Sequence, residues 1–194
     1  MRFKKLFAVV LGSLIVPALS LPSMAQNELQ VSDFANANVK GAPSATVQIV
    51  NPGTTFGNLC AMIYVFKADA TMTECCGCLM EHNALITLDV NDDLTSNPAP
   101  DGGIFGIPAR TGVIKIVSAE QTIGCDPTSI SAFPELRAWA THIENSVNGV
   151  YPITRTAFSN ADLGDAEFAF LQSACKQIFN RGLFKPQGSC SCGH

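Results

Sequence analysis

Short stretches of alternating apolar and polar residues occupy most of the chain before residue 160. Residues 45–53, 84–92 and 111–120 each contain apolar side chains at every second position, and Asn-Pro-Gly closes the first of them. Successive side chains of a β-strand point to opposite faces, so this alternation predicts half-buried strands.

Residues 59–68, LCAMIYVFKA, are apolar at both sets of alternate positions. A strand with two apolar faces is typical of the centre of a fold, where both sides are covered. We therefore expect a central strand here.

Residues 134–145 fit two structures. Leu136, Trp139 and Ile143 keep a helical spacing, and Pro134 suits the first position of a helix. Trp, Thr and Ile also favour strands, and the following residues 149–158 have the character of a strand. We favour a strand, with a helix as the alternative.

Residues 165–181 predict an amphipathic helix. Phe168, Leu171, Cys175 and Ile178 share one face, and Gly182 follows the last turn. The order of the elements predicts a mainly β fold: an antiparallel β-sandwich of the Ig-like or Greek-key type with a C-terminal amphipathic α-helix.

The N-terminus has the pattern of a secretory signal peptide. Three basic residues precede an apolar run from Leu6 to Leu21, and Ser23-Met24-Ala25 provides small residues for cleavage. We expect residues 1–25 to be removed, residues 26–45 to form a loosely held N-terminal arm or an edge segment, and residues 46–194 to form one domain. The expected location is extracytoplasmic: the periplasm, the cell surface or the medium.

The predicted mature chain is acidic. Of the 12 Lys and Arg residues, three lie in the signal peptide, so nine remain against 16 Asp and Glu, a net charge of −7. This charge argues against nucleic acid as a partner. We expect no membrane span in the mature chain and an extracellular protein or glycan as partner.

The cysteine count is even, which in an exported chain favours disulfides. The candidates are all eight cysteines: Cys60, Cys75, Cys76, Cys78, Cys125, Cys175, Cys190 and Cys192. Sequence alone allows about 105 pairings. A hairpin turn at residues 67–71 would bring Cys60 opposite the Cys76–Cys78 region, and the chain after Gly182 would bring Cys190 or Cys192 back onto the helix near Cys175.

Two cysteine clusters, CCGC at residues 75–78 and CSCGH at residues 190–194, also allow a metal site. Thiolate and imidazole side chains are ligands for zinc, copper(I) or an iron–sulfur cluster. The candidate ligands are Cys75, Cys76, Cys78, His82, Cys190, Cys192 and His194. The Cys75–Cys78 spacing also occurs in redox motifs, but no helix is predicted after it, as those motifs require.

A calcium site is a further candidate, at the end of residues 84–92. Asp89, Asn91, Asp92 and Asp93 place oxygen ligands in a short acidic segment that resembles those of calcium-rigidified extracellular sandwiches. The alternative is a strand that ends in a solvated acidic turn.

The chain also resembles a family of uncharacterised secreted bacterial proteins. The resemblance covers residues 47–194 and rests on ECCGC, within residues 59–78, and on LTSNPAPDG, GVIKIVSA, LRAWATHI and the Cys-rich tail. It implies export and a mainly β fold, and it implies no activity or catalytic residues.

Sequence motifs of common enzymes are absent, including the Gly-x-Ser-x-Gly and His-Glu-x-x-His motifs. We therefore expect an exported, non-enzymatic β-sandwich with a binding, surface or structural role and no required cofactor. The alternative is an extracytoplasmic thiolate metal-binding or redox protein that uses the CCGC and CSCGH clusters.

Overall fold

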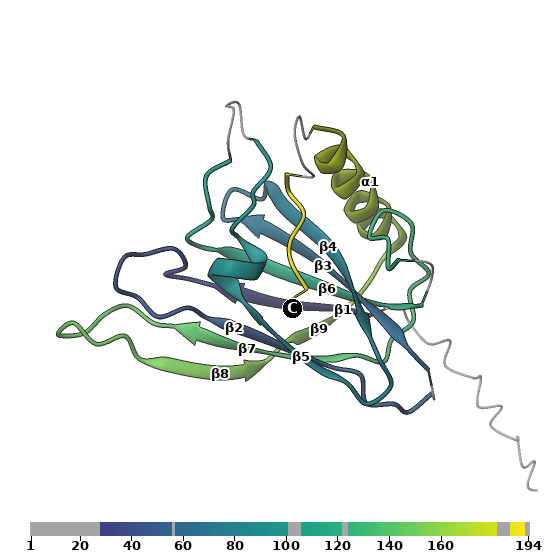
Figure 1. The fold of residues 1–194 in the computed structure, drawn as a ribbon, viewed down its shortest axis with the longest axis horizontal. Coiled ribbons are helices and arrows are strands. Elements are labelled where there is room, and N and C mark those ends of the chain that lie inside the picture. Colours follow the sequence, from purple (N-terminus) through teal and green to yellow (C-terminus); the bar gives the residue numbers. More distant parts are fainter. Residues whose placement is uncertain (1–27, 56, 101–105, 122–123, 182–186, 193–194) are drawn as a thin grey trace, which may run out of the picture.

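The computed structural model describes residues 28–192 except 56, 101–105, 122–123 and 182–186. Two antiparallel β-sheets pack face to face, and one helix covers the outer side of the larger sheet (Figure 1). The predicted β-sandwich with a C-terminal helix is confirmed.

The larger sheet has five strands. In spatial order they are β4 (Met72–Met80), β3 (Leu59–Lys67), β6 (Gly112–Glu120), β1 (Glu28–Phe34) and β9 (Ser159–Asp162).

The smaller sheet has four strands. In spatial order they are β5 (Leu85–Asp89), β2 (Thr46–Val50), β7 (Arg137–Ile143) and β8 (Ile153–Ala157). A short π-helical segment, η1 (Val90–Leu94), follows β5, and helix α1 spans Asp165–Arg181.

Strand β3 divides the apolar interior into two cores. Ala61, Ile63 and Val65 face the smaller sheet and belong to the core between the sheets. Met62 and Tyr64 face the opposite way, into a second core closed by α1. Both faces of β3 are buried, as its sequence predicted, because a sheet covers one face and a helix the other.

The expectation of a loosely held N-terminal arm or edge segment is wrong for residues 28–34. These residues form β1, an inner strand held between β6 and β9. The side chain of Gln30 is buried and donates to the Leu136 carbonyl at 2.5 Å. The polar composition concealed the strand because its buried polar groups have hydrogen-bond partners.

The ambiguous residues 134–145 contain strand β7, so the favoured interpretation is confirmed. Ala138 and Ala140 face the core, and Trp139 lies on the outer face of the smaller sheet, where Arg155 stacks on its ring with a distance of 5.7 Å from the Arg155 guanidinium carbon to the ring centroid.

The chain changes sheets between β8 and β9. β8 pairs with β7, and two residues later β9 pairs with β1 in the other sheet. β9 pairs with β1 only as far as Val31, whereas β6 continues along β1 to Phe34. A fork therefore opens between the end of β1 and the β7–β8 hairpin, which projects from the sandwich (Figure 1).

Candidate functional site: the disulfide framework and the fork cleft

All eight cysteines are paired, which confirms the predicted disulfides. The four bonds are Cys60–Cys125, Cys75–Cys175, Cys76–Cys190 and Cys78–Cys192, with Cα–Cα distances of 5.3–5.9 Å. These distances lie in the normal range for disulfides.

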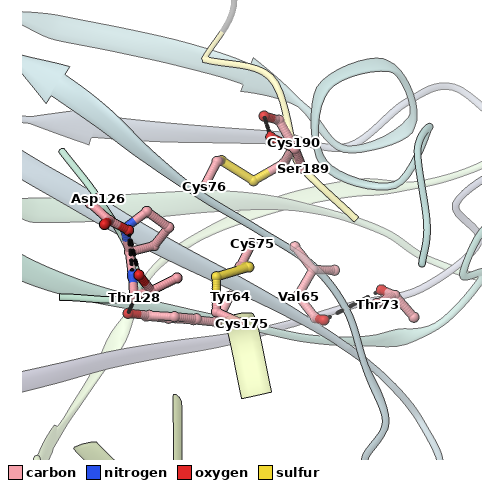
Figure 2. The surroundings of a disulfide bond; sticks show 11 residues. Tyr64, Val65, Thr73, Cys75, Cys76, Asp126, Thr128, Cys175, Ser189 and Cys190 are labelled. Carbon is pink, nitrogen blue, oxygen red and sulfur yellow. Dashed lines mark hydrogen bonds between the residues drawn. A yellow bond between two sulfur atoms is a disulfide. The ribbon is translucent and has the colours of Figure 1, made fainter. Parts of the chain in front are cut away.

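The ECCGC motif works through the two-residue period of a strand. Cys75 points toward α1 and bonds Cys175, whereas Cys76 and Cys78 point to the other face of β4 and bond the tail. Figure 2 shows the bonds from the neighbours Cys75 and Cys76 leaving the strand in different directions. One strand thus anchors the helix on one face and the C-terminus on the other.

The pairing expected for Cys60 is wrong. The turn at residues 67–71 forms, with the Lys67 amide donating to the Thr71 carbonyl, but the register places Ala61 opposite Cys78 and Cys60 opposite Leu79. Cys60 therefore faces the α1 side of the sheet while Cys76 and Cys78 face the other side, and Cys60 bonds Cys125 instead.

The expected link from Cys175 to the tail is also wrong. Cys175 lies in the core beneath α1, and Cys75 is the cysteine of β4 that faces it. Cys190 and Cys192 contact the opposite core.

The tail runs beside the free edge of β4 and hydrogen-bonds to its backbone. The Cys75 amide donates to the Gly188 carbonyl at 2.7 Å, and the Gly188 amide donates to the Asn97 carbonyl at 2.6 Å. Cys75 and Ser189 form a parallel bridge. The tail thus covers backbone groups that an edge strand would otherwise expose.

Gly188 is required by this arrangement. Its φ is +87°, and a Cβ there would lie 1.9 Å from Cγ2 of Ile178 on α1. A glycine allows both the backbone angle and the close approach of the helix.

The predicted metal ligands do not all lie together, and Cys190 is bonded to Cys76. The sulfur atoms of Cys76, Cys78 and Cys192 lie within 4.8 Å of one another, and no other such cluster of His, Cys, Asp or Glu occurs among the described residues. Cys75 lies on the other face, and His194 is outside the described residues. His82 follows β4 after one residue, where its ring borders Gly53. In the oxidised protein the three clustered sulfur atoms belong to the disulfides Cys76–Cys190 and Cys78–Cys192 and are not thiolates.

The acidic segment has a structural use. One Asp89 carboxylate oxygen accepts from the amides of Asn91 and Asp92 at 2.8 and 2.9 Å, which caps η1. The Asp93 carboxylate accepts from the Asp89 amide at 2.8 Å. These bonds fit the alternative interpretation, a capped turn, and a calcium site stays a prediction.

Glu74 is a buried carboxyl group that the sequence analysis did not single out. It is fully buried on β4, and its Oε1 accepts from the Asn97 amide at 3.1 Å, while Oε2 has no hydrogen-bond partner. Burial raises the pKa of Glu74 to about 8, and the Asn97 hydrogen bond lowers it less. The acid in ECCGC was visible in the sequence, but its burial was not.

The fork contains a polar cleft that the sequence analysis also missed. Two hollows of about 310 and 280 Å³ share Asp33, His142 and Thr156. His142 Nε2 lies 2.7 Å from the Thr156 hydroxyl, and His142 Nδ1 lies 3.8 Å from the Asp33 carboxylate. His142 and Thr156 lie on the paired strands β7 and β8, whereas Asp33 lies on β1, more than 100 residues earlier in the chain.

The order acid, imidazole, hydroxyl is that of a nucleophilic triad, but the geometry differs. A triad requires the acid to hydrogen-bond the imidazole, and 3.8 Å exceeds that range. The Asp33 side chain is also 77% exposed. The cleft instead offers hydrogen-bond donors and acceptors to a polar ligand.

A scan against protein-family models, a search of curated proteins and a search of solved structures each gave no match. The resemblance to secreted bacterial proteins therefore stays a prediction. No helix within the described ranges is long and apolar enough to cross a membrane.

Proposed function

We propose that the protein is an exported, non-enzymatic β-sandwich with a binding or surface role, which folds in an oxidising compartment. The observation that carries the proposal is the pairing of all eight cysteines in four disulfides. Disulfides persist in extracytoplasmic compartments and are rare in a reducing cytosol. The signal-peptide pattern of residues 1–25 points the same way.

The fork cleft is the proposed binding site. Its larger hollow is lined by the side chains of Glu144, Thr154 and Thr156 as well as Asp33 and His142. Carboxylates, hydroxyls and an imidazole pair with the hydroxyl groups of a saccharide or with the backbone of a peptide. The proposed ligand is an extracellular glycan or protein segment.

The export proposal is tested by the mass of the protein recovered outside the cytoplasm, alkylated without reductant after denaturation. We expect a chain that begins at Gln26, has a mass about 8 Da below that of the fully reduced chain, and carries no alkyl group. Alkylated cysteines in the protein from the producing cell would contradict the proposal.

The binding proposal is tested by titrating isotope-labelled, oxidised protein with short oligosaccharides and with extended peptides. We expect NMR shifts that concentrate at Asp33, His142 and Thr156 and that disappear in His142→Ala. Shifts confined to other surfaces, or unchanged shifts in the variant, would refute the cleft as the site.

A further inference from the structure

We propose that the two tail disulfides are reducible as a pair, and that their reduction creates a four-thiolate site for a cation of the zinc class. The ligands are Cys76, Cys78, Cys190 and Cys192. The inference goes beyond the proposed function, which concerns the oxidised protein, and a site in the reduced protein can fail without affecting it.

The four cysteines are placed regularly along β4 and the tail. Both disulfides join residues 114 apart, so two cysteines spaced by one residue on β4 face two cysteines with the same spacing in the tail. The Cα atoms of the bonded pairs are 5.3 and 5.4 Å apart. The four sulfur atoms therefore form two adjacent rungs between two neighbouring segments.

The sulfur atoms are close to the spacing of a tetrahedral metal site. The sulfurs of Cys76, Cys78 and Cys192 lie within 4.8 Å of one another, and the sulfur of Cys190 is bonded to that of Cys76. Zinc–thiolate bonds of about 2.3 Å in a tetrahedral site place the sulfurs roughly 3.8 Å apart. Cys190 is not part of this 4.8 Å group, so after reduction its thiolate has to turn inward toward Cys78 and Cys192 to complete the site.

The other four cysteines cannot join this metal site, because they lie on the opposite side of the larger sheet. Cys75 and Cys175 are bonded in the core beneath α1, and Cys60 and Cys125 contact that same core. The site therefore uses four of the seven ligands that the sequence suggested.

The tail disulfides are also more accessible to a reductant than those beneath α1. Cys192 is partly exposed, whereas Cys60, Cys75 and Cys175 are fully buried. A dissolved dithiol therefore reaches Cys78–Cys192 before the disulfides of the helix-side core. The thiols released at Cys78 and Cys192 then lie beside Cys76 and can exchange with the second rung.

A dithiol supplies the electrons and protons that reduce the two tail disulfides. Each dithiol transfers two electrons and two protons to one disulfide, becomes a cyclic disulfide, and leaves two protein thiols. Two dithiols thus convert both rungs to four thiols. The bound divalent cation then replaces the four thiol protons, which are released to solvent.

The test uses the full mature chain, reduced under limiting dithiol, freed of reductant without oxygen and titrated with Co²⁺. We expect one Co²⁺ per chain with the absorption of a tetrahedral thiolate complex, and displacement by Zn²⁺. Zn²⁺ is also expected to protect Cys76, Cys78, Cys190 and Cys192 from alkylation. This mapping needs no variant, so it is independent of any folding defect.

Two double variants complete the test. Cys76→Ser with Cys190→Ser removes two ligands and should abolish the cobalt spectrum, whereas Cys60→Ser with Cys125→Ser removes another disulfide and should retain it. No cobalt spectrum in the reduced wild type, equal loss in both variants, or zinc protection of other cysteines would overturn the proposal.

Discussion

Glu74 shows how burial alters a single carboxyl group. No charged partner compensates its burial, so the neutral form is favoured and the pKa rises from its usual 4.5 to about 8. Between about pH 4.5 and pH 8, therefore, Glu74 keeps its proton in the folded protein but has released it in the unfolded chain. The stability that this group contributes is present at low pH and is lost as the pH rises from about 4.5 through about 8.

Glu74→Gln is therefore expected to flatten the dependence of stability on pH. A single group of this kind gives a slope of at most about 1.4 kcal/mol per pH unit. The free energy of unfolding in urea, measured at pH 5, 6.5 and 8 with the disulfides intact, should fall less in the variant than in the wild type. An unchanged slope would show that Glu74 is ionised or solvated in the folded protein.

Glu135 is the matched control, because its environment acts in the opposite direction. Partial desolvation favours its neutral form, but hydrogen bonds from the hydroxyls and amides of Thr54 and Thr55 outweigh this and lower its pKa. The Thr55 amide donates to Oε1 at 2.9 Å. In Glu135→Gln the free energy of unfolding should still decline above pH 5, because Glu74 is unchanged. Below pH 5 it should fall less than in the wild type, because the variant has no carboxylate at this position to protonate.

At the scale of elements, β4 holds α1 to the sandwich through Cys75–Cys175. The helix also buries Leu171 and Ile178 against the larger sheet, and Glu167 pairs with Lys115 on β6 at 2.6 Å. Replacing both cysteines by alanine should reduce the free energy of unfolding by about 2–5 kcal/mol.

This loss of stability is expected to affect α1 more than the sheets. Hydrogen exchange of the amides in α1 should accelerate in the double variant, while the amides of β3 and β6 keep their protection. Equal acceleration throughout the chain would mean that the helix and the sheets unfold as one unit.

The contact between tail and helix gives a second prediction at this scale. Gly188→Ala introduces a methyl group into Ile178 at a positive φ, which should cost about 1–3 kcal/mol and loosen the tail. The reduction of the tail disulfides by dithiol, followed by alkylation, should accelerate.

Gly149→Ala is the control for that experiment. Gly149 has a φ of +80° at the tip of the β7–β8 hairpin, and a Cβ there meets no atom within 4 Å. The variant carries the same kind of backbone strain away from the tail, so its reduction rate should match the wild type. If reduction accelerated equally in both variants, the contact between Gly188 and Ile178 would not be what limits the reduction of the tail disulfides.

At the scale of the whole molecule, local patterns predicted most of the elements. The alternation of residues 46–50, the two apolar faces of β3 and the helical face of α1 each follow from which neighbours are buried. β1 was missed because Gln30 and Ser32 are polar yet buried, so its pattern resembles that of an exposed segment.

The sites were harder to predict than the elements. The disulfide partners depend on which face each cysteine occupies, and that requires the register of β3 on β4 and the position of α1. The fork cleft joins β1 to residues more than 100 positions later. Sequence patterns contain the candidates for such sites, but distances between remote residues arise only from the complete topology.

The rungs between β4 and the tail also impose an order in time. Under the proposed export from the N-terminus, Cys76 and Cys78 emerge long before their partners, because 114 residues separate the members of each pair. Cys75 acquires its partner Cys175 earlier than its neighbour Cys76 acquires Cys190. Closure of the framework therefore waits until Cys190 and Cys192 emerge, and before that point Cys76 and Cys78 are two unmatched thiols on an open strand edge.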